Sequence, residues 1–337
     1  MKHVSILVPK DKAILSSIVG PYKLLKAANK FLINTGREER DLFDIYLVGI
    51  EKDSVLYDGA FSIHCDRTIH EIGKTDLIII PAFKPEKLPD QVKKNYAFVP
   101  WIKKQRELYN AELASLCLGA FVLAETGLMD GRRCATHWAG TDILKKMHPQ
   151  IRVVSSKIVT EEDGIYTSGG AYSFLNLMLH LVEKYCGRDT AIFISKFFEI
   201  EVDRENQNQF AIFQGQKDHE DDVIKQAQTY IEGNVSKKIS VEKLAEKYSV
   251  SRRNFVRRFK KATQNTPLQY IQRVKIESAK KSLESTQDNV AEVMFGVGYS
   301  DQKAFRSVFK KYVGLSPVAY KNKYNRSMVD FENPTTW

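Results

Sequence analysis

Short apolar runs alternate with longer helical patterns through the first 186 residues. The apolar runs are of strand length and occupy residues 3–9, 43–50, 76–83, 111–117 and 157–169. Apolar residues with helical spacing occupy residues 16–36 and 172–187. Residues 77–80 are apolar at successive positions, which is typical of a strand buried on both faces. The pattern therefore predicts an α/β fold with a doubly wound, mostly parallel sheet between layers of helices.

The strand pattern ends near Asp189. Residues 189–222 begin with a helical pattern and then become polar and rich in Gln and Asn, and everything beyond them has the pattern of helices. We therefore expect an all-α C-terminal domain. The expected boundaries are an α/β domain at 1–195, a linker at 196–221, the helical domain at 222–325 and a tail at 326–337 that has no pattern to interpret.

The helical region contains an internal repeat with an offset of fifty residues. Its members are Phe255, Phe259, Lys260, Lys261, Thr266, Pro267 and Tyr270, which recur as Phe305, Phe309, Lys310, Lys311, Ser316, Pro317 and Tyr320. Thr266 and Ser316 each place a hydroxyl group before a proline, as in an N-cap followed by the first helical position. We therefore expect two structural units, each ending where another helix begins.

The first copy has the pattern of a helix, a tight turn and a second helix. Apolar residues at 241, 244, 245 and 248 predict the first helix, and Phe255 and Phe259 predict one face of the second. Polar and cationic side chains occupy the other faces of the second helix, where they can donate to base edges in a DNA major groove or to phosphates. The candidate DNA-binding residues are Ser251, Arg252, Arg253, Asn254 and Arg257, with Arg258 as a further cation.

The second copy repeats this arrangement. Gly298 lies where the turn requires a positive φ, and Ser300 is expected to cap the following helix. The candidate DNA-binding residues here are Ser300, Asp301, Gln302, Lys303 and Arg306. The alternative is a pair of amphipathic helices whose charges are only solvated. The repeat, the caps and the local charge together favour DNA binding.

Positive charge is concentrated in the same region. The chain has a net charge of +10, and residues 222–325 hold 21 Lys and Arg against 9 Asp and Glu, a net of +12. The rest of the chain holds 30 against 32, a net of −2. Charge separated in this way is expected of a domain that meets the phosphates of double-stranded DNA.

Residues 222–325 resemble the DNA-binding domain of the AraC/XylS family, in which a long helix joins two helix-turn-helix units. Residues 266–285 correspond to that helix, and residues 298–321 are similar to the signature segment of the family. Ser249 departs from the family pattern where the first turn often has glycine, and Met294 departs where the second unit usually has alanine. The resemblance implies two recognition helices that enter successive major grooves of an operator site.

Cys117 lies between a predicted strand and a predicted helix, with Gly119 two positions later. This is the arrangement of a nucleophile elbow, in which the side chain is exposed above the sheet. The N-terminus of the following helix is expected to lower the pKa of the thiol. His137 is the candidate base, so Cys117 and His137 are the residues that could carry catalysis.

The order of strand, Cys117, helix and His137 resembles the class I glutamine amidotransferase-like superfamily, in its intracellular-protease-like, PfpI-type branch. The similarity spans about residues 3–190 and includes residues 20–29, 115–138 and 166–170. This domain is known ahead of an AraC-type domain in transcription factors, and the whole chain is similar to that subfamily.

Several parts that enzymes of this superfamily use are missing here. They usually have an acidic residue four positions before the proline that is Pro21 in this chain, which has Ser17. Leu118 follows Cys117 where protease-like members have histidine, and Phe83 stands in an oxyanion loop that is commonly rich in glycine. We therefore expect Cys117 and His137 to be vestigial and the protein not to be an enzyme.

Three roles for the α/β domain stay open. The preferred one is a ligand or redox-sensing pocket lined by Ser17, Phe83, Cys117, Leu118 and His137, with a small-molecule effector. In the second, the domain is only structural or dimerising, with Cys117 a small buried residue and His137 a helix cap. In the third, the chain is a cysteine-dependent amidase or hydrolase that uses Cys117. A homodimer is expected.

Composition excludes several other classes. The chain of 337 residues has 43% hydrophobic and 27% charged residues, and no apolar run approaches the length of a membrane span. The apolar start is too short for a signal sequence, and the four cysteines form no C-x-x-C pair. We expect a cytoplasmic protein with no metal and no cofactor. The interpretation is a sequence-specific DNA-binding transcriptional regulator.

Overall fold

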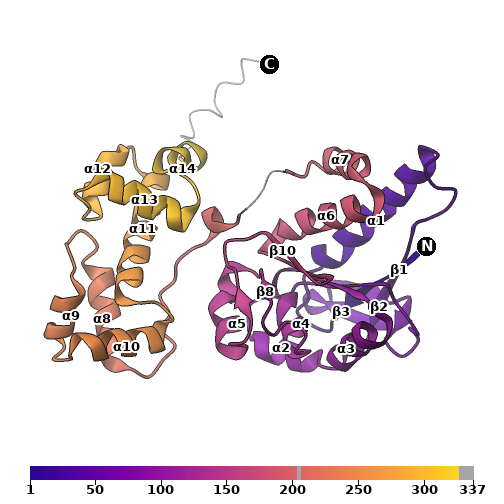
Figure 1. The fold of residues 1–337 in the computed structure, drawn as a ribbon, viewed down its shortest axis with the longest axis horizontal. Coiled ribbons are helices and arrows are strands. Elements are labelled where there is room, and N and C mark those ends of the chain that lie inside the picture. Colours follow the sequence, from indigo (N-terminus) through magenta and orange to yellow (C-terminus); the bar gives the residue numbers. More distant parts are fainter. Residues whose placement is uncertain (203–205, 326–337) are drawn as a thin grey trace, which may run out of the picture. The chain divides into compact units, whose positions relative to one another are not determined.

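The computed structural model describes residues 1–202 and 206–325, so the predicted tail at 326–337 lies outside the described residues. The chain forms two compact units, one from Met1 to Gln207 and the other from Asn208 onward (Figure 1). The division falls within the predicted linker at 196–221. In the described part of the chain, no helix is long and apolar enough to cross a membrane.

A seven-stranded sheet forms the centre of the first unit. Its strands are β1 (Lys2–Val8), β2 (Phe43–Gly49), β5 (Arg67–Thr68), β6 (Leu77–Ile80), β7 (Glu112–Ser115), β10 (Val159–Glu162) and β11 (Ile165–Ser168). Their order is β10-β11-β7-β6-β1-β2-β5, and every neighbouring pair is parallel except β10 with β11. The chain runs from β1 outward to β2 and later returns to the other side of β1 with β6. The predicted doubly wound, mostly parallel sheet is therefore confirmed.

Helices cover both faces of this sheet (Figure 1). One layer contains α1 (Ser16–Asn34), α6 (Phe174–Cys186) and α7 (Arg188–Phe197), and the other contains α2 (Leu88–Lys94), α3 (Phe98–Tyr109), α4 (Ala120–Glu125) and α5 (Thr141–Met147). Val4 and Ile6 of β1 pack in the core beneath α1 and α6, whereas Leu7 packs in the core with α3 and α4. Since both faces are buried, the central strand β6 is apolar at every position.

Residues 157–169 form a hairpin, so the prediction of one strand was wrong. β10 and β11 pair antiparallel, and Asp163 and Gly164 make the two-residue turn between them. Both turn residues have positive φ, 51° for Asp163 and 70° for Gly164. An Asp-Gly pair favours this kind of turn. That pair is the signal in the sequence that identifies the hairpin.

Other elements were not predicted because they are too short to show a period. β3 (Asp53–Leu56) and β4 (Phe61–His64) form a separate antiparallel hairpin, and β8 (Arg133–Cys134) pairs in parallel with β9 (Arg152–Val153). β5 has only two residues, and α2 and α5 have seven each. A helical period needs a window of about 11 residues or more to be recognised.

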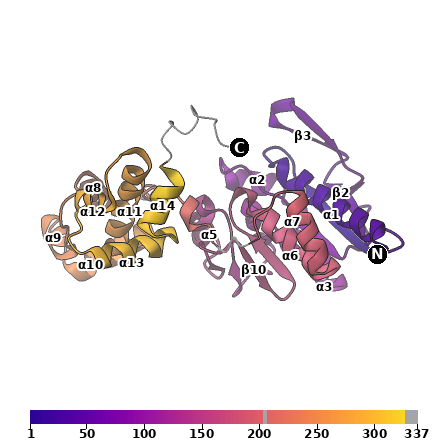
Figure 2. The same ribbon diagram turned by 90° about the horizontal axis from the view of Figure 1, so that it is seen from above.

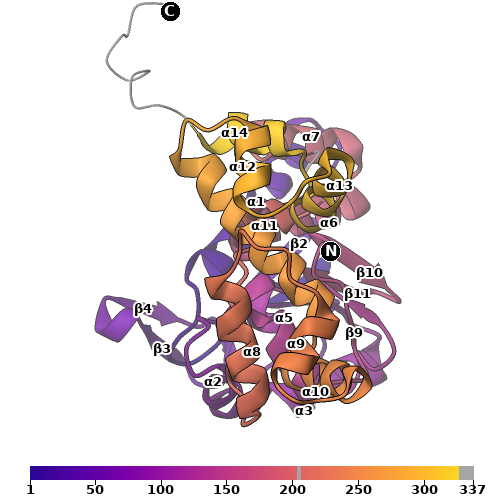
Figure 3. The ribbon, with the colours of Figure 1, turned by 90° about the vertical axis from the view of Figure 1, so that its left-hand side faces the viewer.

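The described residues of the second unit form helices and no strand. Its helices are η5 (Asn208–Phe210), α8 (Asp222–Gly233), α9 (Val241–Lys247), α10 (Arg252–Thr263), α11 (Pro267–Ser285), α12 (Val290–Gly296), α13 (Gln302–Val313) and α14 (Pro317–Tyr324). α11 runs from the group α8–α10 to the group α12–α14 (Figures 1 and 3). Tyr270 and Ile271 of α11 belong to the core of the first group, and Ile276 and Leu283 belong to the core of the second. α11 is therefore the long joining helix that the sequence predicts.

The fifty-residue repeat corresponds to two equivalent helix-turn-helix units, α9 with α10 and α12 with α13. Phe255 and Phe259 of α10 and the matching Phe305 and Phe309 of α13 have no exposed surface. The predicted caps are also confirmed. The hydroxyl groups of Thr266 and Ser316 cap α11 and α14, and a proline follows each of them at the first helical position.

The cap of α13 differs from the prediction. Asp301, and not Ser300, is the N-cap, and its carboxylate accepts a hydrogen bond from the N–H of Ala304 at 2.7 Å. Four residues separate α9 from α10, whereas five separate α12 from α13. The additional residue leaves Ser300 one position before the cap. Asp301 therefore takes the place that Ser251 has in the first unit.

Each of these turns contains one residue with positive φ, Ser249 at 53° and Gly298 at 72°. The predicted conformation of Gly298 is confirmed. Gly298 also has no room for a side chain, because a Cβ atom there would lie 2.5 Å from the carbonyl oxygen of Ser236. Ser249 adopts the same backbone conformation at the position where the resembled family often has glycine.

Candidate functional site

The outer face of α10 carries the first set of candidate residues. Ser251, Arg252, Arg253 and Arg257 are exposed, and Asn254 is half-buried. Ser251 caps the helix by accepting the N–H of Asn254. Arg252 Nε donates to Glu242 of α9 at 2.7 Å, and Arg257 donates to the side-chain oxygen of Asn254 at 2.8 Å. Arg252 is still 69% exposed, so its guanidinium is oriented and accessible at the same time.

The matching face of α13 carries the second set. Ser300, Asp301, Gln302, Lys303 and Arg306 are all exposed. The carboxylate of Asp301 is used by the helix cap. Gln302, Lys303 and Arg306 make no hydrogen bond or ion pair with any residue of the described ranges. One amide and two cations on this face therefore remain able to donate to another molecule.

Figures 2 and 3 show α10 and α13 on the same side of the second unit. Lys275 of α11 fixes the connection between α8 and α9 and the turn that precedes α13. It is 5% exposed, and its Nζ donates to the carbonyl oxygens of Val235, Lys237 and Val297 at 2.7 to 3.0 Å. Val235 and Lys237 follow α8, and Val297 ends α12. Burial lowers the pKa of Lys275, and the three carbonyl groups satisfy its three N–H donors.

Arg258 is not available for DNA as the sequence suggested. Its guanidinium makes two hydrogen bonds, at 2.6 and 2.8 Å, with the carboxylate of Asp221, which caps α8. The Arg258 guanidinium holds the pKa of Asp221 below its usual range. A two-point contact of this kind fastens α10 to the start of α8. Arg258 is therefore a structural residue, and this correction could not be made without the fold.

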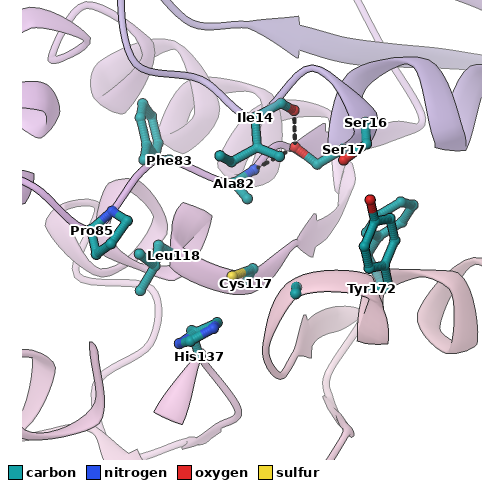
Figure 4. A pocket seen from close by; sticks show the side chains of 12 residues that line it. Ile14, Ser16, Ser17, Ala82, Phe83, Pro85, Cys117, Leu118, His137 and Tyr172 are labelled. Atoms are coloured by element: carbon teal, nitrogen blue, oxygen red, sulfur yellow. Dashed lines mark hydrogen bonds between the residues drawn. The ribbon is translucent and has the colours of Figure 1, made fainter. Parts of the chain in front are cut away.

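The first unit contains a pocket of about 190 Å³ at the carboxyl ends of its parallel strands (Figure 4). Its walls come from the segments that follow β1, β6, β7, β8 and β11. The strand order reverses between β1 and β6, and doubly wound sheets bind ligands at such a point. The structure places all five residues of the predicted pocket in its wall: Ser17, Phe83, Cys117, Leu118 and His137.

The hydroxyl of Ser17 accepts a hydrogen bond from one backbone N–H of the loop after β6. Its Oγ donates to the carbonyl oxygen of Ile14 at 2.6 Å and accepts the N–H of Ala82 at 2.9 Å (Figure 4). Ala82 lies in the segment that corresponds to the oxyanion loop of the resembled enzymes, which bind a developing negative charge with such groups. Because the N–H of Ala82 already donates to Ser17, this N–H is not directed at a ligand. Phe83, the next residue, is 2% exposed.

Cys117 has the backbone of an elbow but not the exposed thiol that the sequence predicted. Its φ is 55°, and a Cβ atom at Gly119 would lie 2.5 Å from the carbonyl oxygen of Pro81. Cys117 is only 5% exposed, and burial raises the pKa of its thiol to about 11. The N–H groups of Ala171 and Leu118 act in the opposite direction with a smaller effect. The expectation of a lowered pKa was wrong because burial outweighs these donors.

His137 lines the same pocket and caps a helix. Its Nδ1 accepts the N–H of Ala139 at 3.1 Å, at the start of η3 (Trp138–Gly140). Burial lowers the pKa of His137, which favours the neutral imidazole, and a ring whose Nδ1 accepts carries its proton on Nε2. Within the described ranges no hydrogen bond joins His137 to Cys117. The arrangement of a base beside a nucleophile is not formed in this structure.

Sequence reasoning missed part of the pocket wall. The additional lining residues are Ile14, Ser16, Ala82, Pro85, Ala171, Tyr172 and Phe174. All of them follow the ends of parallel strands, which is the signal that could have found them. Tyr172 is 63% exposed, whereas Phe174 is 3% exposed. Among the described residues that line the pocket, none is Asp, Glu, Lys or Arg.

Comparison with known proteins agrees with this division of the chain. The DJ-1/PfpI family matches residues 3–184, and a helix-turn-helix domain matches residues 244–323. The HTH-type transcriptional regulator CdhR of Pseudomonas aeruginosa is 26% identical over 298 residues, which cover 87% of this chain and 84% of that protein. The HTH-type transcriptional regulator GbdR of Pseudomonas aeruginosa is 26% identical over 206 residues, which cover 61% of this chain and 56% of that protein.

A solved structure supports the fold. It is the crystal structure of a protein from Vibrio parahaemolyticus, described as a candidate transcriptional regulator. It matches with a TM-score of 0.50 and 23% identity, over 58% of this chain and 98% of the other. The match at residues 3–184 covers more than half of the sequence and contains the sheet and the pocket of the first unit. The chain belongs to the DJ-1/PfpI family, and it carries an AraC-type helix-turn-helix domain after its DJ-1/PfpI domain.

Proposed function

We propose that this protein is a sequence-specific DNA-binding transcriptional regulator. The observation that carries the proposal is the pair of equivalent helices α10 and α13, which lie on the same side of the second unit. Both helices carry exposed amide or cationic side chains. The net charge of +12 over residues 222–325 adds attraction to phosphate groups. The two regulators from Pseudomonas aeruginosa are named for the same role, which supports it.

Base recognition is assigned to the exposed side chains on these helices. On α13 these are Gln302, Lys303 and Arg306, and on α10 they are Arg252, Arg253, Asn254 and Arg257. Glutamine pairs with adenine through two hydrogen bonds, and arginine pairs with guanine in the same way. Ser251 and Asp301 cap their helices, so their contribution to DNA binding comes through the position of the helix. Ser300 is exposed and lies one position before the cap of α13, so its hydroxyl is assigned to a phosphate contact beside that helix.

The test of this function is a selection of DNA sites from random sequence with the full-length protein, followed by binding to the selected and to a scrambled site. We expect a defined site that is bound about 1,000-fold or more tightly than the scrambled one. Gln302→Ala should weaken binding to the selected site by about tenfold and leave binding to scrambled DNA nearly unchanged. Equal losses on both sites would reassign Gln302 to the phosphate backbone. A protein that selects no sequence contradicts the proposal.

The first unit is proposed to be a sensing domain without catalytic activity. Three features support this: the buried thiol of Cys117, whose pKa burial raises to about 11, the absence of a hydrogen-bonded base beside it among the described residues, and the occupied N–H of Ala82. The pocket suits a small, uncharged and largely apolar effector. A charged molecule would lose its hydration without meeting a charged partner in the lining.

The second candidate function is a cysteine-dependent amidase or hydrolase, and the positive φ of Cys117 favours it. The two functions are separated by turnover. We expect the purified protein to release no product from amide or peptide substrates, and Cys117→Ala to leave DNA binding without effector intact. Turnover that disappears in Cys117→Ala would establish the enzyme instead.

Two further expectations belong to this proposal. The chain is proposed to act as a homodimer, which light scattering of the purified protein would test. A cytoplasmic location is proposed because the DNA is there, and the cysteines of the described residues are unpaired thiols, as expected in a reducing compartment. In the described ranges no cluster of His, Cys, Asp and Glu could hold a metal ion.

A further inference from the structure

Gln207, a polar residue in the predicted linker, is buried in the first unit with 1% of its surface exposed. Its Nε2 donates to the carbonyl oxygens of Thr136 at 2.9 Å, Ser155 at 3.0 Å and Lys157 at 3.2 Å. Its Oε1 accepts the N–H of Gly170 at 2.7 Å. The side chain thus satisfies both polar ends of its amide inside the protein. A buried glutamine with this many partners is held firmly.

The loop after β11 fits closely against this side chain. A Cβ atom at Gly169 would lie 2.7 Å from Nε2 of Gln207. A Cβ atom at Gly170 would lie 2.8 Å from Cδ2 of His137 and 3.2 Å from Oε1 of Gln207. Neither glycine has a positive φ, so space and not backbone conformation requires them. The loop is therefore confined between Gln207 on one side and His137 on the other.

The same loop forms part of the pocket wall. Ala171 and Tyr172 line the pocket, and the N–H of Ala171 points to the thiol of Cys117. Ala171 has a φ of 34°, which is strained for a residue with a side chain. Gln207 also holds the segment that carries His137, because its Nε2 donates to the carbonyl oxygen of Thr136, the residue before His137. Gln207 therefore joins two loops that face the pocket from different strands.

Gln207 is also the last residue of the first unit, and Asn208 opens η5 of the second. Its backbone N–H donates to the carbonyl oxygen of Ser156 at 3.0 Å, and Asn206 pairs with Lys157. The chain that continues into the helical unit is thus fastened behind the pocket at this point. If Gln207 loses its hydrogen bonds in the first unit, the chain that leads into the second unit loses its attachment at this point.

We propose that Gln207 couples the Cys117 pocket to the connection between the two units, and that filling the pocket releases Gln207 from its position. A ligand that presses on Ala171 pushes the loop toward Gln207, because Gly169 and Gly170 leave no spare room. Release of Gln207 and occupation of the pocket are then linked, and each favours the other. The consequence for DNA affinity rests on the proposed function, whereas the coupling inside the first unit does not.

The first experiment fills the pocket by substitution in the full-length chain. Cys117→Met extends the side chain into the cavity, and Cys117→Ser is the matched control that leaves the cavity empty and keeps an acceptor for the N–H of Ala171. Hydrogen exchange is followed in the peptides that contain Gly170 and Gln207. We expect exchange about tenfold faster in both peptides of Cys117→Met, as the loss of one or two buried hydrogen bonds produces, and wild-type exchange in Cys117→Ser. Unchanged exchange in a folded Cys117→Met protein overturns the proposal.

The second experiment runs in the opposite direction and does not depend on the folding of Cys117→Met. Gln207→Ala removes the anchor, and Gln214→Ala changes an exposed glutamine nearby as the control. Alkylation of Cys117 by iodoacetamide is followed by peptide mass. Gln207→Ala should react about tenfold faster than the wild type, because the loop at 169–172 loses its support. A wild-type rate in Gln207→Ala, or an equal increase in Gln214→Ala, contradicts the coupling.

DNA binding is measured on the same proteins to separate the two proposals. Cys117→Met should change the affinity for the selected DNA site in the otherwise wild-type chain by about threefold or more, and should have no further effect in the Gln207→Ala background. An equal effect in both backgrounds contradicts the role of Gln207. Failure of every variant and of the wild type to bind DNA contradicts the proposed function, while the exchange and alkylation results still decide the coupling.

Discussion

At the scale of single residues, Cys117 has the strained backbone of a nucleophile elbow but not a reactive thiol. Hydrogen bonds on both sides fix this corner: the hydroxyl of Thr136 donates to the carbonyl oxygen of Cys117 at 2.9 Å, and the hydroxyl of Ser168 accepts its N–H at 3.3 Å. The same packing that fixes the corner removes water from the thiol. A conformation that serves a nucleophile in related folds here places a neutral, polarisable group at the base of a pocket.

The raised pKa of Cys117 predicts a particular pH profile for its alkylation. With a pKa of about 11, only about one thiol in ten thousand is ionised at pH 7. The iodoacetamide rate of Cys117, followed by peptide mass, should therefore rise about tenfold for each pH unit through pH 9 and level off only near pH 11. A plateau reached below pH 8 would mean an activated thiolate and would restore Cys117 as a redox sensor or nucleophile.

The pocket residues show what a sequence can reveal at this scale. Cys117 was found from its strand-to-helix corner, and Ser17, Phe83, Leu118 and His137 were found from the resemblance to the amidotransferase-like superfamily. The fold brings them together because parallel strands direct their carboxyl ends to one edge. Gln207 could not be found. It lies in a polar, Gln-rich stretch, and its burial depends on carbonyl groups from loops that only the tertiary fold brings around it. Likewise, the sequence predicted an exposed Cys117, because the spacing of apolar residues does not show how closely neighbouring loops cover the turn between β7 and the following helix.

At the scale of elements, the two helix-turn-helix units have separate but equivalent cores and differ in their turns. The buried phenylalanines are equivalent at an offset of fifty, whereas the helices before them are offset by forty-nine. One extra residue in the second turn moves the capping role from a serine to Asp301. The helical unit was predictable in its number of repeats and in its joining helix, because these follow from repeated apolar spacing. The cap was not, since a local serine and aspartate compete for it.

Substitution at the two competing positions separates them. Asp301→Ala should lower the free energy of unfolding by about 1 kcal/mol, because the N–H groups at the start of α13 lose their acceptor. Ser300→Ala should change it by less than about 0.5 kcal/mol, as expected for an exposed residue outside a cap. Urea unfolding followed by far-ultraviolet circular dichroism measures both. The reverse order of the two losses would return the cap to Ser300.

The pair of Arg258 with Asp221 predicts a stability that depends on acid. Arg258→Met should lower the free energy of unfolding at pH 7 by about 1–2 kcal/mol, reduced from a fully buried pair because both side chains are partly exposed. The pKa of Asp221 is held below its usual range, so this contribution is complete above about pH 4 and is lost as the pH falls through the folded-state pKa.

The measurement is urea unfolding of the wild type and of Arg258→Met between pH 7 and pH 3. The difference between them should stay constant down to about pH 4 and shrink below it. Arg253→Met is the control, because Arg253 is exposed on the same helix and should cost less than about 0.5 kcal/mol at every pH. A difference that grows in acid would show that Arg258 does not act through the ionised carboxylate.

At the scale of the whole molecule, the chain separates two tasks into two units of different charge. The α/β unit has an uncharged pocket at its strand ends, and the helical unit carries the excess positive charge and the two candidate recognition helices, α10 and α13. The fold class of each unit and the nature of the domains were predictable, because the spacing of apolar residues and the net charge are properties of long segments and do not depend on any single residue. The connection was not predictable, because residues 206–207 pack into one unit and the chain from Asn208 belongs to the other.

The central claim is that α10 and α13 together read one DNA site. Its most direct test is a hydroxyl-radical footprint of the full-length protein on the site selected from random DNA, at low and at physiological salt. We predict two protected stretches on one face of the duplex, about one helical turn apart, with affinity that falls steeply as salt rises. Protection of a single stretch would show that one of the two helices does not read DNA, and the absence of protection at low salt would contradict the account.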